Sequence, residues 1–569
     1  MNTMEKQNSK VNKEFSLNEK YLQGTIIFLI TVLLVIFIAL PFTSLFAKAF
    51  TDTKGDFIGI KNFSVYFTTP ALLSSLSNSL FISILSSLIA VFLGFAYAYG
   101  IHRTAMRLKG FFKVVAILPL FAPSMLYSIA LIYLFGNKGI FTTLGMDINL
   151  YGPVGIIISE VIFAFPQVFL ILSVGLSMAD YRLYETAQVL NTSSFRTFFR
   201  ITLPSIKYSL ISSIFVTFIL CFTDFGAPKI LGGNYNVLAT DIYKQIVGQF
   251  NMPMGAVASI VMLIPVLIAF FIDRLALKKQ GVTISAKSST YVIKENKLRD
   301  GILFFICSVT AIIIITLILT ATLGSFINLW PYDIKPTLKH YKFSGLMNSG
   351  WDTYINSLKV SLLTAAFGTV FTFTAAYFIE KIKRFKAIRQ VGYFLSMIPL
   401  ALPGLVIGLS YIFFFNSSNN PLNFMYKTIG ILVLANIVHF YSVSFMTSTT
   451  ALKMLDEEFE IVAKSMKVPF YRLFFKVTLP LSLEAILEVA MYYFLNSMVT
   501  VSALIFLYTP KTQTASISIL KLSENGDGGS AAAMAVLILL TNIVVKVVYE
   551  TISKNIKKSS QKWKVTKSI

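Results

Sequence analysis

Twelve long apolar runs constrain this chain more than any other feature, because each is long enough to cross a lipid bilayer as a helix. A membrane helix needs about 20 mostly apolar residues to span roughly 30 Å of hydrocarbon. With 55% hydrophobic residues, the sequence predicts an all-α, polytopic membrane protein. The runs lie near residues 24–47, 73–100, 114–136, 152–176, 207–228, 255–277, 301–324, 355–379, 391–415, 428–449, 483–507 and 530–550.

The positive charges indicate how these runs are oriented. The formal net charge is +23, but Lys and Arg lie in short clusters at the ends of apolar runs. This is the positive-inside pattern of membrane proteins and not a nucleic-acid-binding face. We therefore expect a multi-pass protein of the cell membrane, with both termini in the cytoplasm, the lipid bilayer around it and no nucleic-acid partner. The first run is too long for a signal-peptide core, so we expect it to stay as a membrane anchor.

One short polar and aromatic segment occurs twice. Residues 184–204 read YETAQVLNTSSFRTFFRITLP, and residues 460–480 read EIVAKSMKVPFYRLFFKVTLP. Chance does not produce this similarity at one constant offset. The offset aligns Ala187 with Ala463, Arg196 with Arg472, Leu203 with Leu479 and Pro204 with Pro480.

The repeat extends into the membrane runs. Asn78 in the second run aligns with Asn356 in the eighth, and a pair of prolines recurs in the third and ninth. An even number of runs in each copy predicts two tandem, parallel six-helix domains. The polar linker carries no functional motif and joins the two halves. The predicted boundaries are a cytoplasmic N-terminal tail 1–23, a first domain 24–277, a linker 278–300, a second domain 301–550 and a basic cytoplasmic C-terminal tail 551–569.

The pattern of the repeated segment predicts a short amphipathic helix on the cytoplasmic side. Asp180 is a suitable N-cap for it, the paired phenylalanines are apolar anchors, and a proline starts the next membrane helix. Such a helix, with small and aromatic residues, suits a groove on a partner protein. An interfacial helix on the lipid headgroups is the alternative. Two copies with the same Thr-Leu-Pro ending favour the partner.

These residues resemble the EAA loop of permease subunits from binding-protein-dependent ABC importers. That loop contains a Glu-Ala-Ala triplet, then a glycine, and ends in Leu-Pro. The first copy has Glu185, Thr186 and Ala187 at the triplet, Asn191 at the glycine, and Leu203 with Pro204 at the ending. The second has Ile461, Val462 and Ala463 at the triplet, Glu460 displaced by one position, Lys467 at the glycine, and Leu479 with Pro480 at the ending. Both copies thus depart from the family at the glycine.

The resemblance implies two fused permease domains and a set of partners. In the family, the loop docks in a groove of the ATPase and transmits its closure to the membrane helices. The chain contains no G-x-x-x-x-G-K-[ST] phosphate loop. We therefore expect no catalytic residue, enzyme activity or cofactor here. The expected partners are separate cytoplasmic ABC ATPase subunits, in two copies, and an extracytoplasmic solute-binding protein.

Several polar residues in the apolar runs are candidates for the substrate path, because polar groups in membrane helices tend to face protein or water. Asp224 is the strongest candidate, since Gly226 and Pro228 favour a break in its helix. The alternative for Asp224 is a position at the outer end of the helix, where it is simply exposed to water. For Asn78 and Asn356 the alternative is hydrogen bonding between helices, which is also the expected role of Glu160. The three histidines are scattered, so no metal site is predicted.

The solute follows from resemblance alone. The segment that begins at Asp224 resembles fused permeases for 2-aminoethylphosphonate, which makes that compound the favoured cargo. The broader two-domain pattern also resembles ferric-iron permeases, which is the first alternative. A secondary transporter driven by an ion gradient is another, although the chain has few ionisable groups at mid-membrane. A membrane-embedded enzyme lacks any suitable cluster of His, Cys or carboxylates.

Overall fold

The structure is a computed structural model that describes residues 19–146, 148–280, 291–293, 295–343 and 350–565. Residues 1–18, 281–290, 294 and 566–569 of the predicted tails and linker lie outside this range. The described chain is almost entirely helical, which confirms the all-α, polytopic class. Its two short strands, β1 (Ile327–Leu329) and β2 (Asp333–Pro336), pair antiparallel.

In the described part of the chain, ten helices are long and apolar enough to cross a membrane, or eleven if one bent pair is counted. They are Glu19–Ala49, Pro70–Arg103, Ser124–Thr143, Pro153–Ser177, Ser194–Thr223, Met252–Lys278, Lys297–Phe326, Asp352–Glu380, Ile429–Lys453 and Gly528–Ile556, and the pair is Lys386–Ala401 with Gly404–Phe415, bent by 115°. Twelve runs were predicted. The run near 483–507 forms a helix of only 17 residues, because the backbone becomes extended at Thr500.

The chain folds as two compact units. One consists of Phe46–Tyr354 and Gln513–Leu540, and we call it the α4 unit. The other, the α16 unit, consists of Met1–Leu45, Ile355–Thr512 and Thr541–Ile569. The boundaries fall within α2 (Leu40–Ala49), within α16 (Asp352–Glu380), after Thr512 and within α25 (Gly528–Val565), not at the linker. Consequently the first membrane helix of each predicted half belongs to the unit that holds most of the other half.

In the α4 unit, α4 (Pro70–Arg103) packs against α8 (Pro153–Ser177), α11 (Leu203–Thr223) and α15 (Lys297–Phe326). Its core consists mainly of apolar side chains from these helices and from α5 (Lys109–Ile117). The other elements are α3 (Lys61–Thr68), α5 (Lys109–Ile117), η2 (Leu118–Phe121), α6 (Ser124–Phe135), α7 (Ile140–Thr143), α9 (Tyr181–Val189), α10 (Ser194–Thr197), η3 (Phe198–Thr202), α12 (Gly226–Leu231), α13 (Leu238–Tyr243), η4 (Lys244–Gly248), α14 (Met252–Gln280), η5 (Lys339–Lys342) and α24 (Ala515–Glu524).

In the α16 unit, α19 (Ile429–Lys453) packs against α23 (Leu483–Val499). Tyr411 donates a hydrogen bond to the carbonyl of Phe37 at 2.8 Å, which ties the first membrane helix to α18. The remaining elements are η1 (Val35–Ala39), α2 (Leu40–Ala49), α16 (Asp352–Glu380), α17 (Lys386–Met397), η6 (Ile398–Ala401), α18 (Gly404–Phe415), η7 (Asn423–Met425), α20 (Glu458–Ser465), α21 (Phe470–Leu473), η8 (Phe474–Thr478), α22 (Leu479–Leu481) and α25 (Gly528–Val565), which continues from the α4 unit.

Candidate functional site

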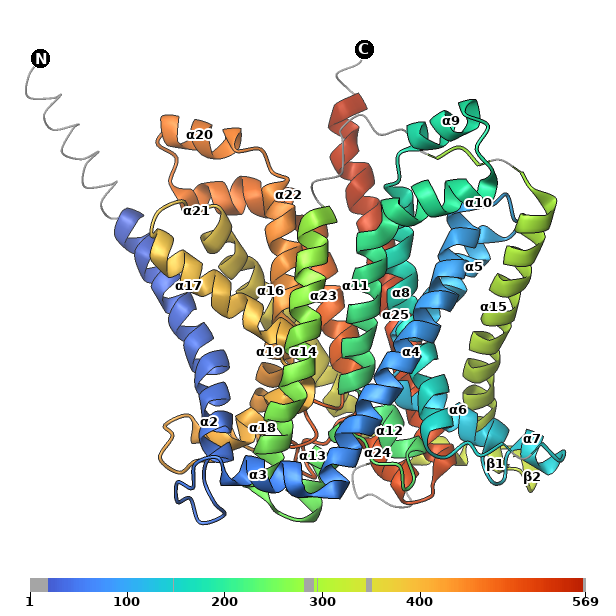
Figure 1. Cartoon of the computed structure of the whole chain (residues 1–569). Coiled ribbons are helices and arrows are strands. Elements are labelled where there is room, and N and C mark those ends of the chain that lie inside the picture. The colour runs from blue at the N-terminus through green and yellow to red at the C-terminus, as the bar shows by residue number, and fades with distance from the viewer. Residues whose placement is uncertain (1–18, 147, 281–290, 294, 344–349, 566–569) are drawn as a thin grey trace, which may run out of the picture. The chain divides into compact units, whose positions relative to one another are not determined.

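The two repeated segments fold into the same succession of elements. In the first loop (residues 180–204), α9 is followed by α10, the π-helix η3 and the start of α11. In the second loop (residues 456–480), α20 is followed by α21, the π-helix η8 and α22. Pro204 and Pro480 both lie in the first turn of the helix that follows, where a missing N–H costs little. Figure 1 shows α9 farther from the membrane helices of its own unit than α10 is.

Equivalent hydrogen bonds start the two loop helices. Asp180 accepts one from the backbone N–H of Arg182 at 3.1 Å, which confirms its role as the N-cap of α9. Asp456 accepts one from the N–H of Glu458, also at 3.1 Å. Each carboxylate satisfies a donor that the first helical turn leaves free, and its charge suits the helix N-terminus. The two copies therefore begin with the same local chemistry.

The two loop helices also end alike, at the position where the related loops carry glycine. Asn191 has φ 48° and Lys467 has φ 55°, so both are left-handed. The N–H of Thr192 bonds the carbonyl of Ala187 at 2.9 Å, and the N–H of Val468 bonds that of Ala463 at 2.8 Å. These are the bonds of a Schellman ending, which glycine adopts without strain. The fold thus keeps the glycine geometry without the glycine.

Lys467→Gly is expected to stabilise the second loop by about 1 kcal/mol, because a left-handed L-residue costs roughly that much and glycine does not. Asn191→Gly should gain less, since asparagine tolerates this conformation better. Amide hydrogen exchange of residues 458–467 in the full chain measures the effect. Lys467→Ala is the control, because it shortens the side chain but keeps Cβ. An equal gain from alanine and glycine would contradict this account.

One phenylalanine of each pair anchors its loop to its own unit. The ring of Phe198 lies 6.0 Å from that of Phe95 and 5.9 Å from that of Tyr99, both on α4. The ring of Phe474 lies 4.7 Å from that of Tyr377 on α16. Aromatic pairs at such distances add to the apolar contact that they bury. The following residue of each pair, such as Phe199, is exposed. The predicted anchoring role therefore belongs to the first ring.

A buried cation lies beneath the first loop helix. Arg103, in the last turn of α4, is 2% exposed and donates from Nη2 to the carbonyl of Leu176 at 2.7 Å. Its guanidinium carbon is 5.5 Å from the ring centre of Tyr184 in α9. A guanidinium above an aromatic face is attracted by the ring quadrupole. This contact holds α9 to the end of α4.

The second loop has a cation at the matching place. Lys381 follows α16 and donates to the carbonyl of Leu455 at 3.0 Å. Its Nζ is 2.9 Å from Oε1 of Glu460, and the two side chains are only 8% and 17% exposed. Under the repeat, Lys381 corresponds to Arg103 and Glu460 corresponds to Tyr184. The displaced glutamate of the second copy therefore has a defined partner, which sequence reasoning missed.

A second ion pair on this loop is exposed and serves as a comparison. Lys383 donates to Oε2 of Glu457 at 2.7 Å, but these side chains are 68% and 70% exposed. The hydrogen bond from Lys383 lowers the pKa of Glu457. Exposed pairs contribute little to stability because water and salt screen them. The largely buried pair between Lys381 and Glu460 is therefore the one that fixes α20.

The outward faces of both loop helices carry exposed apolar side chains beside polar and charged ones. Leu190 is 72% exposed, and Met466, at the equivalent position, is 71% exposed. Ala187 and Ala463 are buried, so these small side chains pack against other residues of the same chain. Glu185 and Thr186 lie on the exposed face of α9. Further exposed apolar residues are Leu183, Val189, Phe195 and Phe199 in the first loop and Phe459, Ile461, Val462 and Phe475 in the second.

The helix that follows each loop stops at an equivalent residue. Asp224 follows α11 with φ −67° and ψ 138°, and Thr500 follows α23 with φ −70° and ψ 139°. Asp224 accepts hydrogen bonds from the hydroxyl of Ser124 and, at 2.9 Å, from the N–H of Ala227. The predicted break after α11 is present, and a similar break recurs in the second half. A role for Asp224 in the substrate path stays a prediction.

A serine and a glycine exchange places at the two breaks. In the α4 unit, a Cβ on Gly226 would meet the hydroxyl of Ser124 at 2.6 Å. In the α16 unit, a Cβ on Gly404 would meet the hydroxyl of Ser502. Gly404 corresponds to Ser124, and Ser502 corresponds to Gly226. Each half thus leaves space for one hydroxymethyl group only.

Gly226→Ser is expected to destabilise the chain by roughly 1–3 kcal/mol, because it overfills this contact. The double variant Ser124→Gly with Gly226→Ser copies the arrangement of the second half and should recover most of the loss. Thermal unfolding of the purified protein measures both. Failure of the double variant to exceed the single one would contradict the pairing.

The two asparagines that recur in the repeat, Asn78 and Asn356, hold backbone carbonyls. Asn78 donates from its amide to the carbonyl of Asn236 at 2.9 Å, and Asn356 donates to that of Lys511, also at 2.9 Å. Both bonds join a membrane helix to the segment beyond a break. This agrees with the hydrogen-bonding alternative, while substrate contact by these residues stays a prediction. Glu160 is fully buried in α8, and neither of its carboxyl oxygens has a hydrogen-bond partner in the described part of the chain.

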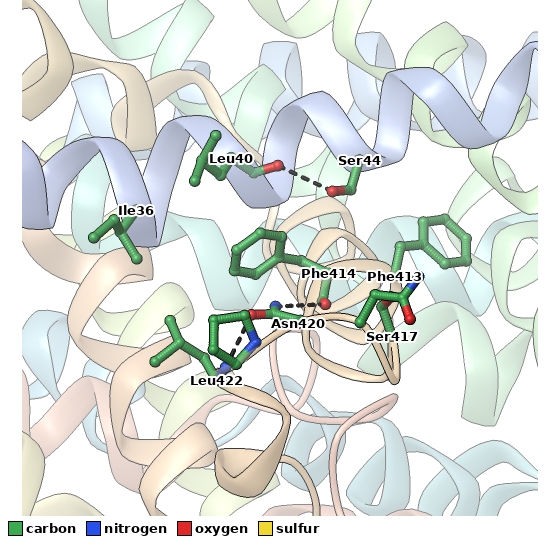
Figure 2. Close-up of a pocket in the computed structure, with 10 residues that line it drawn as sticks. Ile36, Leu40, Ser44, Phe413, Phe414, Ser417, Asn420 and Leu422 are labelled. Carbon is green, nitrogen blue, oxygen red and sulfur yellow. Dashed lines mark hydrogen bonds between the residues drawn. The ribbon is translucent and has the colours of Figure 1, made fainter.

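A cavity of about 600 Å³ lies in the α16 unit, away from the predicted residues. Figure 2 shows Leu40 and Ser44 of α2 on one side of it, and Phe414, Asn420 and other residues at the end of α18 on the other. Asn420 is held by a hydrogen bond to the carbonyl of Phe414 at 2.8 Å. None of the lining residues is charged. The cavity therefore offers no charged partner to an ionic solute.

Comparison with known proteins identifies the family. The family described as binding-protein-dependent transport system inner membrane component matches residues 88–282 and 368–558, and each match contains one loop. A putative ferric transport system permease protein of Haemophilus influenzae is 28% identical over 85% of this chain and 78% of its own. A ferric transport system permease protein of Actinobacillus pleuropneumoniae is 26% identical over 94% of this chain and 78% of its own.

Two further similarities cover less of the chain. A putative 2-aminoethylphosphonate transport system permease protein of Salmonella typhimurium is 26% identical over 39% of this chain and 81% of its own. One chain of a solved bacterial ABC transporter, involved in the import of the acidic polysaccharide alginate, covers 48% of this chain and 99% of its own, with 20% identity and a TM-score of 0.39. The matches across both repeats decide the family. This chain belongs to the inner membrane components of binding-protein-dependent transport systems and carries two such domains in tandem.

Proposed function

We propose that this chain is the complete membrane passage of an ATP-driven importer, formed by fused permease domains at residues 24–277 and 301–550. A solute-binding protein outside the membrane delivers the cargo. Two ATPase subunits, separate from this chain, bind the two loops on the cytoplasmic side, where both termini also lie. Their closure changes the angle of the loop helices and, through η3 and η8, moves the membrane helices.

The exposed apolar faces of the loops carry this proposal. Leu190 and Met466 occupy equivalent positions and are largely exposed, although the helices that present them are firmly held. Contiguous exposed apolar side chains mark binding surfaces, and an amphipathic helix that presents them fits a groove of a partner. Arg103 and Lys381 hold these helices to α4 and to the end of α16, so a displacement of either loop reaches a membrane helix.

Fe(III) is the favoured cargo, and 2-aminoethylphosphonate, which the sequence favoured, is the second candidate. The ferric permeases are similar to this chain over most of its length, whereas the phosphonate permease is similar over 39% of it.

Uptake into proteoliposomes tests the proposal. The full chain is reconstituted with the ATPase and binding protein encoded by neighbouring reading frames. Radioactive Fe(III) and radioactive 2-aminoethylphosphonate are supplied in separate assays, each with the other compound, unlabelled, as competitor. We expect uptake that requires ATP inside the vesicles and that 2-aminoethylphosphonate does not reduce. Uptake that continues without ATP and stops when the proton or sodium gradient collapses would instead indicate a secondary transporter. Uptake of the phosphonate, but not of iron, would reverse the order of the solutes.

A further inference from the structure

One side chain of the linker, Tyr291, lies against the first loop. Its ring centre is 4.9 Å from that of Tyr184 and 5.4 Å from that of Tyr181, and both pairs meet edge to face. The guanidinium carbon of Arg103 is 3.9 Å from the centre of the Tyr291 ring, closer than to Tyr184. We call these four residues the tyrosine clasp. They join the linker, α9 and the end of α4.

Comparison with the second loop shows which interaction the tyrosine clasp provides for the buried charge of Arg103. There, Lys381 has a carboxylate partner in Glu460, at 2.9 Å. At the equivalent place, the first loop has Tyr184, which brings no negative charge to Arg103. The Nε of Arg103 has no hydrogen-bond partner in the part of the chain that the structure describes. A buried cation needs compensation, and the electron-rich face of Tyr291 provides part of it.

The residues at the C-terminal end of the linker are held at the start of α15. Asn296 caps α15 by accepting from the N–H of Arg299 at 3.1 Å. Asp300, in the first turn of α15, accepts from the N–H of Ala105 at 3.2 Å, just beyond the end of α4. Tyr291 is therefore separated from these fixed points by only a few residues. A ring on so short a tether can restrain the helix that it touches.

We propose that Tyr291 is a positioning residue, which holds α9 at the angle in which its apolar face meets the ATPase. The linker then is a working part of the first loop and not only a joint between the halves. In the second loop, the ion pair of Lys381 and Glu460 does the same task without a linker residue. This inference rests on the proposed function, because the restraint matters only if the loop transmits force.

Three substitutions in the full chain, reconstituted with its ATPase and binding protein, test this role. Tyr291→Ala removes the ring, Tyr291→Leu keeps apolar bulk but lacks the aromatic face, and Tyr291→Phe keeps the face. Val292→Ala is the matched control, because Val292 is the adjacent, exposed linker residue. The measurements are the solute transported per ATP hydrolysed and the amide hydrogen exchange of residues 181–190.

We expect Tyr291→Ala and Tyr291→Leu to raise exchange in α9 about tenfold and to lower the transport ratio several-fold while hydrolysis continues, since aromatic and cation–π contacts are lost. Tyr291→Phe and Val292→Ala should behave as the unaltered chain. If Tyr291→Ala does not fold, Tyr291→Leu carries the test. If the unaltered chain couples transport to ATP hydrolysis, and Tyr291→Leu changes neither the transport ratio nor the hydrogen exchange of α9, the inference is overturned but the proposed function is not. An unaltered chain that binds no ATPase overturns the proposed function instead.

Discussion

Replacing Leu190 and Met466 together with aspartate is expected to reduce ATP-dependent uptake at least about tenfold, because each change puts a charge into the centre of an apolar contact. Both residues are exposed, so the folded chain loses no packing and its membrane insertion should stay normal. Each single variant should retain part of the activity, since the other loop still binds its ATPase. Uptake by right-side-out vesicles that contain ATP, normalised to the amount of inserted chain, measures the effect.

The matched control for this pair is Leu144→Asp. Leu144 is 73% exposed, as exposed as Leu190, but it lies in the segment after α7 and outside both loops. A charge there should leave uptake and ATPase binding unchanged. Equal losses from Leu144→Asp and from the loop variants would mean that added charge, and not the loop surface, impairs the protein.

Breaking the largely buried ion pair of the second loop, between Lys381 and Glu460, is expected to have the other large effect on transport. Lys381→Met leaves the carboxylate of Glu460 without its cation, and Glu460→Gln leaves the ammonium without its anion. Removing one partner of a buried pair costs about 3 kcal/mol, because the remaining charge stays desolvated. We expect α20 to detach, so that ATP hydrolysis continues while the solute carried per ATP falls several-fold.

Two comparisons make this prediction specific. Glu457→Gln breaks the exposed pair with Lys383 and should change neither quantity, since exposed pairs contribute about 0–1 kcal/mol. The double variant Lys381→Met with Glu460→Gln removes both charges and should lose less than the sum of the single variants. Strict additivity in this cycle would show that the two side chains do not act as a pair.

Much of this fold could be predicted from the sequence because its determinants are local. The apolar runs became helices, since a backbone in lipid has few other ways to satisfy its hydrogen bonds. Asp180 caps α9 because its carboxylate reaches the N–H of a residue two positions later. The two loops, which are similar in sequence, also form the π-helices η3 and η8 at equivalent places, although no local rule predicts a π-helix.

The run near 483–507 shows where the apolar pattern misleads. The residues next to Thr500 are apolar or small, as a membrane helix allows, yet α23 ends there. In the other half, α11 ends at the equivalent residue, Asp224. The stop depends on close contacts with another helix, such as the hydroxyl of Ser502 against Gly404. Such contacts join segments far apart in the sequence. A count of apolar residues carries no information about them.

The orientation of the loop helices likewise depends on distant residues. Ala187 was predicted to allow a close approach, and it is buried against its own unit, because Tyr184 and Phe198 turn that side of α9 inward. The partner for Glu460 lies at the end of α16. One available signal was missed. In the alignment that pairs Asn78 with Asn356, Arg103 pairs with Lys381, and these cations lie at and just after the ends of two membrane helices. The first membrane helix of each predicted half belongs to the unit that holds most of the other half, and the sequence carried no such signal of this arrangement.

Photo-crosslinking from the two loops tests the central claim most directly, which is that each loop receives an ATPase subunit. A benzophenone amino acid is placed at 190, at 466 or at 144 in the full chain, within membranes that contain the assembled transporter. The account predicts that positions 190 and 466 both crosslink to the ATPase and that position 144 does not. Crosslinks from 190 and 466 to lipid alone, with the ATPase present and active, would contradict it.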